Sequence, residues 1–183
     1  MSDLTLFLGQ FIRRPGEVRA IAPTGAATAR EMARHITPDM RAVAEIGAGT
    51  GTITRAILGR GLPPGRLELY ELNAAFCERL KVLFPGTRVY NLPAQEMVNS
   101  GRRDLDAVIS GVPTLPMPDR MQAAIVGAAL SVMKPGAPFV QITYGPVPPL
   151  SEAVRAKFGL TYTKSRRIWA NLPPAQVYVF RKE

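Results

Sequence analysis

The most informative segment of the sequence is Ala44-Glu45-Ile46-Gly47-Ala48-Gly49-Thr50-Gly51. An apolar run from Ala42 leads into it and a helical pattern follows it, so the glycines are predicted to form the turn between a buried strand and a helix. Glycines in such a turn permit unusual backbone angles and let a ligand approach the main chain. The spacing is G-x-G-x-G, and Thr52 stands where a dinucleotide-binding fingerprint has its third glycine.

An acidic residue ends the next predicted strand, at 66–71. This residue is Glu71, twenty positions past Gly51. A carboxylate there can accept hydrogen bonds from both ribose hydroxyls of an adenosine. A glycine turn alone is often only a tight turn, but the turn, the carboxylate and the alternation of strands with helices together favour a nucleoside site.

Strands and helices alternate around this turn. Helices are predicted at 24–36, 50–59, 73–83, 119–133 and 151–158, and strands at 42–46, 66–71, 88–91, 105–110, 137–144, 161–169 and 176–181. Such a series predicts a parallel sheet with helices on both faces. The last two strands are joined by so short a connection, Asn171–Pro174, that they must be antiparallel. The predicted fold is therefore α/β: a single doubly wound, Rossmann-like sheet with an antiparallel last strand.

A short amphipathic helix is predicted ahead of this sheet, at 4–12. It can lie flat in the head-group zone of a membrane or pack against the core, and both alternatives stay open. The residues that we predict to contact a membrane are Leu4, Phe7, Leu8, Phe11, Arg13 and Arg14.

Composition narrows the class of protein further. The 183 residues are 46% hydrophobic and carry a net charge of +9, which excludes a disordered chain and indicates an anionic partner, either nucleic acid or membrane phosphate. No apolar run reaches the roughly 18 residues of a spanning helix, and the N-terminus lacks a secretory pattern. The single cysteine excludes an internal disulfide and a cluster of several thiolates around zinc.

The basic excess is concentrated at the two ends of the chain. Residues 151–183 hold seven basic and two acidic side chains, and residues 1–35 hold five basic and three acidic ones. Joined to the apolar face of the N-terminal helix, this distribution favours an anionic bilayer over RNA. We therefore expect a cytoplasmic protein that binds reversibly to the inner face of the cell membrane and has no nucleic acid partner.

Over residues 41–183 the sequence resembles the class I S-adenosylmethionine-dependent methyltransferases. The resemblance implies that the glycine turn lies against the methionine part of the cofactor, that Glu71 binds its ribose and that Glu45 orients it. The product would be S-adenosylhomocysteine, and no metal is expected. The segment after the third strand lacks the Asp that often bonds the adenine amino group, so backbone groups of Ala94 and Gln95, or the Gln95 side chain, would replace it. The cofactor-binding residues implied are Glu45, Gly47, Gly49, Thr50, Gly51, Glu71, Leu72, Ala94, Gln95 and Ser110.

A narrower resemblance rests on Ile109-Ser110-Gly111-Val112-Pro113, which looks like the loop after strand four in compact bacterial phospholipid N-methyltransferases. Three other segments agree with that group: the N-terminal helix followed by Ala20–Thr24, the segment Gln141–Pro146, and Asn171–Ala175. The resemblance implies methylation of phosphatidylethanolamine to its mono-, di- and trimethylated forms, the last being phosphatidylcholine. It divides the chain into a helical extension, 1–36, that covers membrane or substrate, and a class I methyltransferase domain, 37–183.

The predicted catalytic residues are Ser110, Gly111 and Tyr144. Carbonyl oxygens of residues 110–113 would hold the amine, while the Tyr144 hydroxyl accepts or relays a proton or its ring faces the growing ammonium; Tyr144 as a plain core residue is the equal alternative. Trp169 is expected in the core, although an exposed tryptophan would suit a membrane interface.

The lipid phosphate needs fixed cations, and the candidates are Arg19, Arg166 and Arg167. Any one of these arginines can instead be a solvated surface charge. Two other functions stay open: an RNA adenine N-methyltransferase, and a methyltransferase-like binding module without catalysis.

Overall fold

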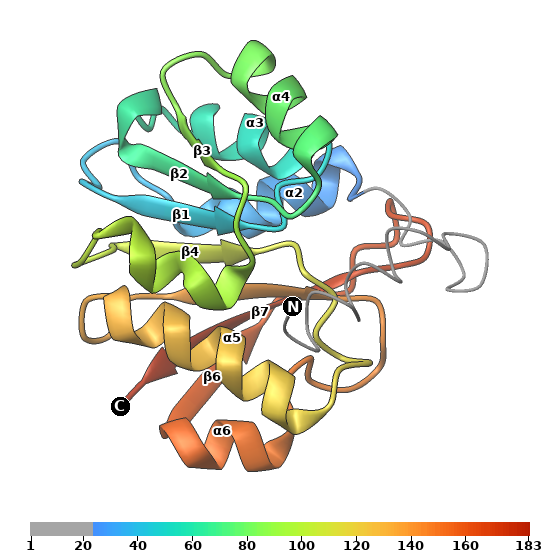
Figure 1. Cartoon of the computed structure of the whole chain (residues 1–183). Coiled ribbons are helices and arrows are strands. Elements are labelled where there is room, and N and C mark those ends of the chain that lie inside the picture. The colour runs from blue at the N-terminus through green and yellow to red at the C-terminus, as the bar shows by residue number, and fades with distance from the viewer. Residues whose placement is uncertain (1–23) are drawn as a thin grey trace.

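The computed structural model describes residues 24–183 (Figure 1). The helix predicted at 4–12, its six membrane-contacting residues and Arg19 lie outside the described residues.

A seven-stranded sheet organises the described chain, in the order β3-β2-β1-β4-β5-β7-β6. Its strands are β1 Val43–Ile46, β2 Leu67–Tyr70, β3 Arg88–Tyr90, β4 Ala107–Ser110, β5 Phe139–Thr143, β6 Leu160–Lys164 and β7 Gln176–Lys182. The first five are parallel, and β7 pairs antiparallel with both β5 and β6. The predicted α/β fold, one doubly wound sheet whose last strand is antiparallel, is confirmed.

Helices cover both faces of this sheet (Figure 1). They are α2 Ala26–Met32, α3 Thr52–Leu58, α4 Ala74–Leu83, α5 Asp119–Val132 and α6 Glu152–Phe158, with 3₁₀ turns at Ala33–His35, Pro64–Arg66 and Ala94–Ser100. Apolar side chains of α2, α3 and α4 form one buried cluster, and those of α5, α6 and the turn Ala94–Ser100 form the other. The described part of the extension predicted at 1–36, residues 24–36, thus packs into the same core as the sheet.

The helix starts that border the carboxyl edge of the sheet are fixed by local chemistry. The residue before α3 has a φ of 83°, and this position is occupied by Gly51 because only a residue without a Cβ adopts that angle at little cost. Asn73 caps α4, and its Oδ1 accepts hydrogen bonds from the backbone N–H of Ala75 and Phe76. Ser151 caps α6 through the N–H of Val154. Among residues 24–183 the structure holds no helix long and apolar enough to cross a membrane.

The strand predicted at 161–169 is shorter than expected. It ends at Lys164, because the Ser165 hydroxyl, instead of the Ser165 carbonyl oxygen, accepts the hydrogen bond from the Val177 N–H, at 3.1 Å. The Ser165 carbonyl oxygen accepts a hydrogen bond from Gln176 Nε2 instead, at 2.8 Å. The connection to β7 is accordingly 165–175, longer than predicted, and a single bridge between Ile168 and Ala175 closes it. We call residues 165–175 the β6–β7 arm; Figure 1 shows it projecting beyond the sheet.

Candidate active site

The site lies at the carboxyl ends of β1 and β4, the two strands between which the strand order reverses. In open parallel sheets this is where ligands bind. The turn after β1 and the loop after β4 meet there backbone to backbone: a Cβ on Gly111 would lie 2.8 Å from the Gly47 carbonyl oxygen, and a Cβ on Gly47 would lie 2.8 Å from Val112 Cγ2. The predicted cofactor turn and the predicted acceptor loop therefore touch.

The three glycines of the turn all have positive φ, 72° at Gly47, 53° at Gly49 and 83° at Gly51. Their surroundings differ. A Cβ on Gly51 would lie 2.4 Å from Phe84 Cε2, so Gly51 is required by packing against α4. A Cβ on Gly49 would meet no atom nearer than the Gly47 carbonyl oxygen at 4.0 Å. Among the described residues, Gly49 is thus the glycine of the turn that borders open space, where a ligand can reach the main chain.

The carboxylate of Glu71 lies against this turn. Its Oε2 accepts the Gly49 N–H and its Oε1 accepts the Asn73 N–H, both at 2.8 Å. Asn91, from the end of β3, donates its side-chain amide to the carbonyl oxygens of Glu71 and Leu72, each at 2.9 Å. The acidic group predicted from the sequence is therefore held beside the glycine that borders open space, as a ribose-binding carboxylate must be.

The region predicted to hold adenine is the 3₁₀ turn Ala94–Ser100. Ala94 is buried there, and the side-chain oxygen of Gln95 is buried without a hydrogen-bond partner among residues 24–183. A buried acceptor left unpaired costs about 1–3 kcal/mol, and an adenine amino group would satisfy it. The open face of Gly49, the Glu71 carboxylate and this oxygen together fit an adenosine.

Glu45 lies in the core behind the turn rather than on its surface. Its Oε2 accepts a 2.7 Å hydrogen bond from the Thr54 hydroxyl on α3, and its Oε1 has no partner within the described part of the chain. Burial raises the pKa of Glu45 to about 8. The carboxyl group is therefore protonated at neutral pH.

This titration predicts a pH-dependent stability that Glu45→Gln removes. An unfolded glutamate titrates near 4.5, so the folded state binds the extra proton between pH 4.5 and about 8, and the stability that this proton supports is lost as the pH rises through that window. At pH 7 the effect is about 3 kcal/mol. The free energies of unfolding of wild type and Glu45→Gln, measured by denaturant titration, should agree near pH 5 and diverge toward pH 8 in favour of the variant. Parallel profiles would show that Glu45 is charged in the folded protein.

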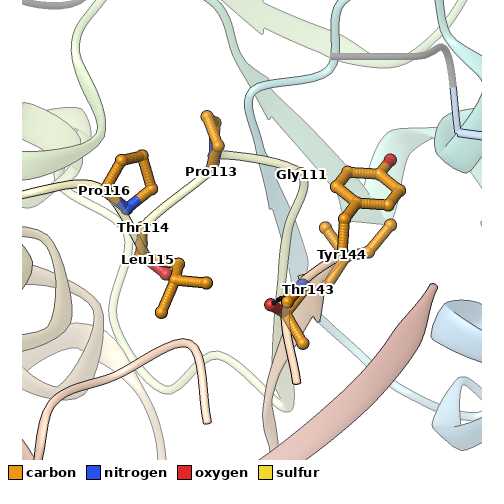
Figure 2. Close-up of a pocket in the computed structure, with 9 residues that line it drawn as sticks. Gly111, Pro113, Thr114, Leu115, Pro116, Thr143 and Tyr144 are labelled. Carbon is orange, nitrogen blue, oxygen red and sulfur yellow. Dashed lines mark hydrogen bonds between the residues drawn. The ribbon is translucent and has the colours of Figure 1, made fainter. Parts of the chain in front are cut away.

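A pocket of about 150 Å³ opens next to the turn, between the loops that follow β4 and β5 (Figure 2). Its lining residues are Gly111, Pro113, Thr114, Leu115, Pro116, Ile142, Thr143, Tyr144 and Gly145. In Figure 2 the ring of Tyr144 stands across the pocket from the proline-rich loop. The volume is below the roughly 300 Å³ at which drug-sized ligand sites begin, so it suits a small group rather than a whole lipid.

Two buried amides, neither of which was predicted from the sequence to be a functional residue, hold the pocket loops in place. Gln122 of α5 donates to the carbonyl oxygens of Thr114 and Met117, and its own oxygen accepts the Ser151 N–H at 2.9 Å. Gln141 of β5 donates to the Val112 carbonyl oxygen at 2.7 Å. The sequence feature that could have revealed both residues is a glutamine within a mainly apolar segment, because a buried amide must find hydrogen-bond partners.

Of the predicted catalytic residues, Tyr144 and Gly111 line the pocket and Ser110 does not. Ser110 is fully buried, and its Oγ has no hydrogen-bond partner among residues 24–183. The Tyr144 hydroxyl lies 3.5 Å from the Thr24 hydroxyl, and burial raises the Tyr144 pKa above its usual value. Tyr144 therefore keeps its proton at neutral pH and is not a base there.

The remaining predicted residues lie around this edge of the sheet. Thr50 is exposed on the turn, with its hydroxyl 3.4 Å from that of Thr52. Arg166 and Arg167 begin the β6–β7 arm, where the Arg167 guanidinium carbon lies 5.9 Å from the centre of the Trp169 ring. In the described part of the chain, His, Cys, Asp and Glu side chains form no group of three that could hold a metal ion.

The order of strands and the place of the glycine turn define the fold of the class I S-adenosylmethionine-dependent methyltransferases. Solved structures with this fold include the 1,6-didemethyltoxoflavin-N1-methyltransferase of Burkholderia thailandensis with bound S-adenosylhomocysteine, at 16% identity and a TM-score of 0.72, over 98% of this chain and 88% of that one. The amino pentose methyltransferase CalS10 of Micromonospora echinaspora, solved with S-adenosylmethionine, gives 15% identity and a TM-score of 0.61 over 84% of this chain and 89% of that one.

A curated sequence relative is nearer in sequence. The chain is 29% identical over 191 aligned positions to the ornithine lipid N-methyltransferase of Singulisphaera acidiphila, covering 99% of this chain and 97% of the relative. No protein-family model matches the sequence.

Proposed function

We propose that this protein is an S-adenosylmethionine-dependent N-methyltransferase that acts on the amine of a membrane lipid. The observation that carries the proposal is the similarity to a lipid N-methyltransferase along nearly the whole of both chains. The site agrees with it, because the cofactor turn touches the loop of a small pocket suited to an amine head group.

On the cofactor side, the glycine turn lies against the methionine part, Glu71 binds the ribose, and the side-chain oxygen of Gln95 accepts from the adenine amino group. When bound, S-adenosylmethionine supplies a methyl group that its sulfonium makes electrophilic. Because the contact between Gly47 and Gly111 sets the spacing of the two loops, it also sets how closely an amine in the pocket faces the cofactor. Alignment of this kind, with water excluded, is the main catalytic task that the chain performs.

On the acceptor side, the pocket receives an amine that must be neutral when it attacks. The carbonyl oxygens of residues 110–113 hold its N–H groups. Tyr144, which keeps its proton, is suited to a hydroxyl relay or to facing the product with its ring, since an ammonium that gains methyl groups loses its N–H donors and is held by cation–π attraction.

Two lipids are candidates for the substrate. The Ser110–Pro113 loop favours phosphatidylethanolamine, methylated stepwise to phosphatidylcholine, whereas the curated relative favours ornithine lipid. In either case the small pocket takes the head group and leaves the acyl chains outside, in the bilayer. The enzyme would therefore bind to the membrane surface, reversibly and at the inner face of the cell membrane. Arg166 and Arg167, together with Arg19, are the proposed contacts for an anionic group of the lipid.

The test is a transfer assay with methyl-labelled S-adenosylmethionine. Vesicles of phosphatidylethanolamine with phosphatidylglycerol, vesicles that contain ornithine lipid, and total RNA are offered in separate reactions. Labelled phosphatidylethanolamine products are expected. Label in ornithine lipid alone would support lipid N-methylation and identify ornithine lipid, not phosphatidylethanolamine, as the substrate. Label in RNA alone would overturn the proposal.

A further inference from the structure

Large apolar side chains are exposed mainly at one edge of the described structure. Seven are exposed in residues 24–183, and four of them lie on the loops at the carboxyl edge of the parallel strands: Leu115, Val147, Trp169 and Leu172. The two most prominent belong to the β6–β7 arm, where Trp169 is 76% and Leu172 87% exposed. The expectation that Trp169 belongs to the core is wrong, because β6 ends before it and the arm carries it away from the sheet.

The arm stands at the same edge as the pocket. In the register of β5 with β7, Thr143 pairs with Gln176, so the arm leaves the sheet beside the end of β5, where Tyr144 begins the pocket wall. Thr24, the first described residue, lies at the same edge, with its hydroxyl 3.5 Å from that of Tyr144.

The middle of the arm is anchored to the start of α2. Asn171 is buried, and its Oδ1 accepts the Gly25 N–H at 2.7 Å and the Thr28 hydroxyl at 3.0 Å, while its Nδ2 donates to the Pro173 carbonyl oxygen at 2.8 Å. Because one side chain binds both the arm and the start of α2, the two exposed apolar residues on either side of it are held in place without being covered.

The charge of the arm is complementary to an anionic surface. Residues 165–175 contain Arg166 and Arg167 and no acidic residue, and Lys164 precedes them. Tryptophan, an aliphatic residue and basic side chains together are the combination that settles at the boundary between head groups and acyl chains. An RNA-binding loop could contact phosphates through the same arginines, but RNA recognition relies on stacking and polar contacts, to which an exposed leucine does not contribute.

We propose that the β6–β7 arm is a membrane-docking element, in which Trp169 and Leu172 enter the head-group boundary of an anionic bilayer while Arg166 and Arg167 bind lipid phosphates. This inference rests on the proposed lipid substrate, since it presents the mouth of the pocket to the surface that holds the lipid. It adds a second docking point that is independent of the helix predicted at 4–12.

Trp169 is the only tryptophan of the chain, so its fluorescence reports on the arm of the full-length protein without a label. On addition of phosphatidylethanolamine vesicles containing phosphatidylglycerol, the emission should shift to shorter wavelength, and phospholipids brominated on their acyl chains should quench it. Emission that vesicles neither shift nor quench would overturn the proposal, as would emission already at short wavelength in buffer, which would mean that residues 1–23 or a second copy covers the arm.

Leu172→Asp should weaken vesicle binding by roughly tenfold or more in a co-sedimentation assay, since it replaces an apolar contact by an anion at the surface. The matched control is Val82→Asp, because Val82 is similarly exposed, at 80%, but lies at the far end of α4, away from the carboxyl edge. For the charges, Arg166→Gln is compared with Lys182→Gln, at the opposite end of β7. Equal losses in variant and control would refute a dedicated docking element.

The same samples separate this inference from the proposed function. All four variants should keep wild-type affinity for S-adenosylhomocysteine, because none of the substituted residues lines the cofactor turn. Leu172→Asp, Val82→Asp and Lys182→Gln should also keep wild-type transfer to lipid dispersed in detergent, whereas Arg166→Gln is left out of that comparison because Arg166 is itself a proposed contact for the anionic group of the lipid. If lipid is labelled but vesicle binding does not depend on Leu172, the docking role of the arm is refuted and the proposed function stands. If Trp169 inserts into vesicles but no lipid is labelled, the docking role of the arm is supported and the proposed function is refuted.

Discussion

Glu71→Ala is expected to weaken binding of S-adenosylhomocysteine by roughly 10- to 100-fold. Hydrogen bonds to a charged group contribute about 1.5–3 kcal/mol, and each 1.4 kcal/mol is a factor of ten in affinity. The variant loses the proposed acceptor for the ribose hydroxyls and also the bonds from the N–H groups of Gly49 and Asn73, both of 2.8 Å. Isothermal titration calorimetry with the purified full-length protein measures the change.

Two further variants show which part of that loss belongs to the carboxylate. Glu71→Gln keeps the shape and one acceptor, so its affinity should fall between those of wild type and Glu71→Ala. Glu78→Ala removes an exposed carboxylate of α4 that pairs with Lys81 at 2.7 Å, and it should bind S-adenosylhomocysteine as wild type does. Unchanged affinity in Glu71→Ala would refute the ribose role, and an equal loss in Glu78→Ala would make the effect one of net charge.

The alternation of strands with helices and the place of the glycine turn could be predicted from the sequence because both are local signals. Short, mainly apolar segments mark β1, β4 and β5, and Glu71 follows β2 at the position where a parallel sheet presents its carboxyl edge. Each of these features depends on residues within a short segment. The periodicity of one segment is therefore enough to reveal it.

The contacts that shape the pocket and the arm could not be predicted in this way. Asn171 binds Gly25 across 146 positions of sequence, and Gln141 binds Val112 across 29, so neither partner can be found from local pattern. β6 ends before Trp169, at the point where the Ser165 hydroxyl accepts the Val177 N–H in place of a backbone carbonyl oxygen. A serine at the end of a strand pattern does not distinguish this outcome from a longer strand.

Gly51→Ala and Gly49→Ala are expected to affect different properties, although the two glycines belong to one turn. At Gly51 the added methyl would lie 2.4 Å from Phe84 Cε2 at φ 83°, so overpacking and backbone strain should together lower the free energy of unfolding by roughly 2–5 kcal/mol. For a chain of this length that corresponds to a loss in Tm of about 4–20 °C. Thermal unfolding of the two variants beside wild type measures the difference.

At Gly49 the added methyl meets only the Gly47 carbonyl oxygen, at 4.0 Å, so the cost to folding is limited to the strain of φ 53°, about 1–2 kcal/mol. The methyl instead occupies the open side of the turn next to the Glu71 carboxylate, where we expect the cofactor to approach. Affinity for S-adenosylhomocysteine should therefore fall at least tenfold in Gly49→Ala while most of the stability is kept, and folded Gly51→Ala should retain the greater affinity of the two. Gly49→Ala that binds like wild type would place the cofactor elsewhere, because no ligand could then be using the open side of the turn.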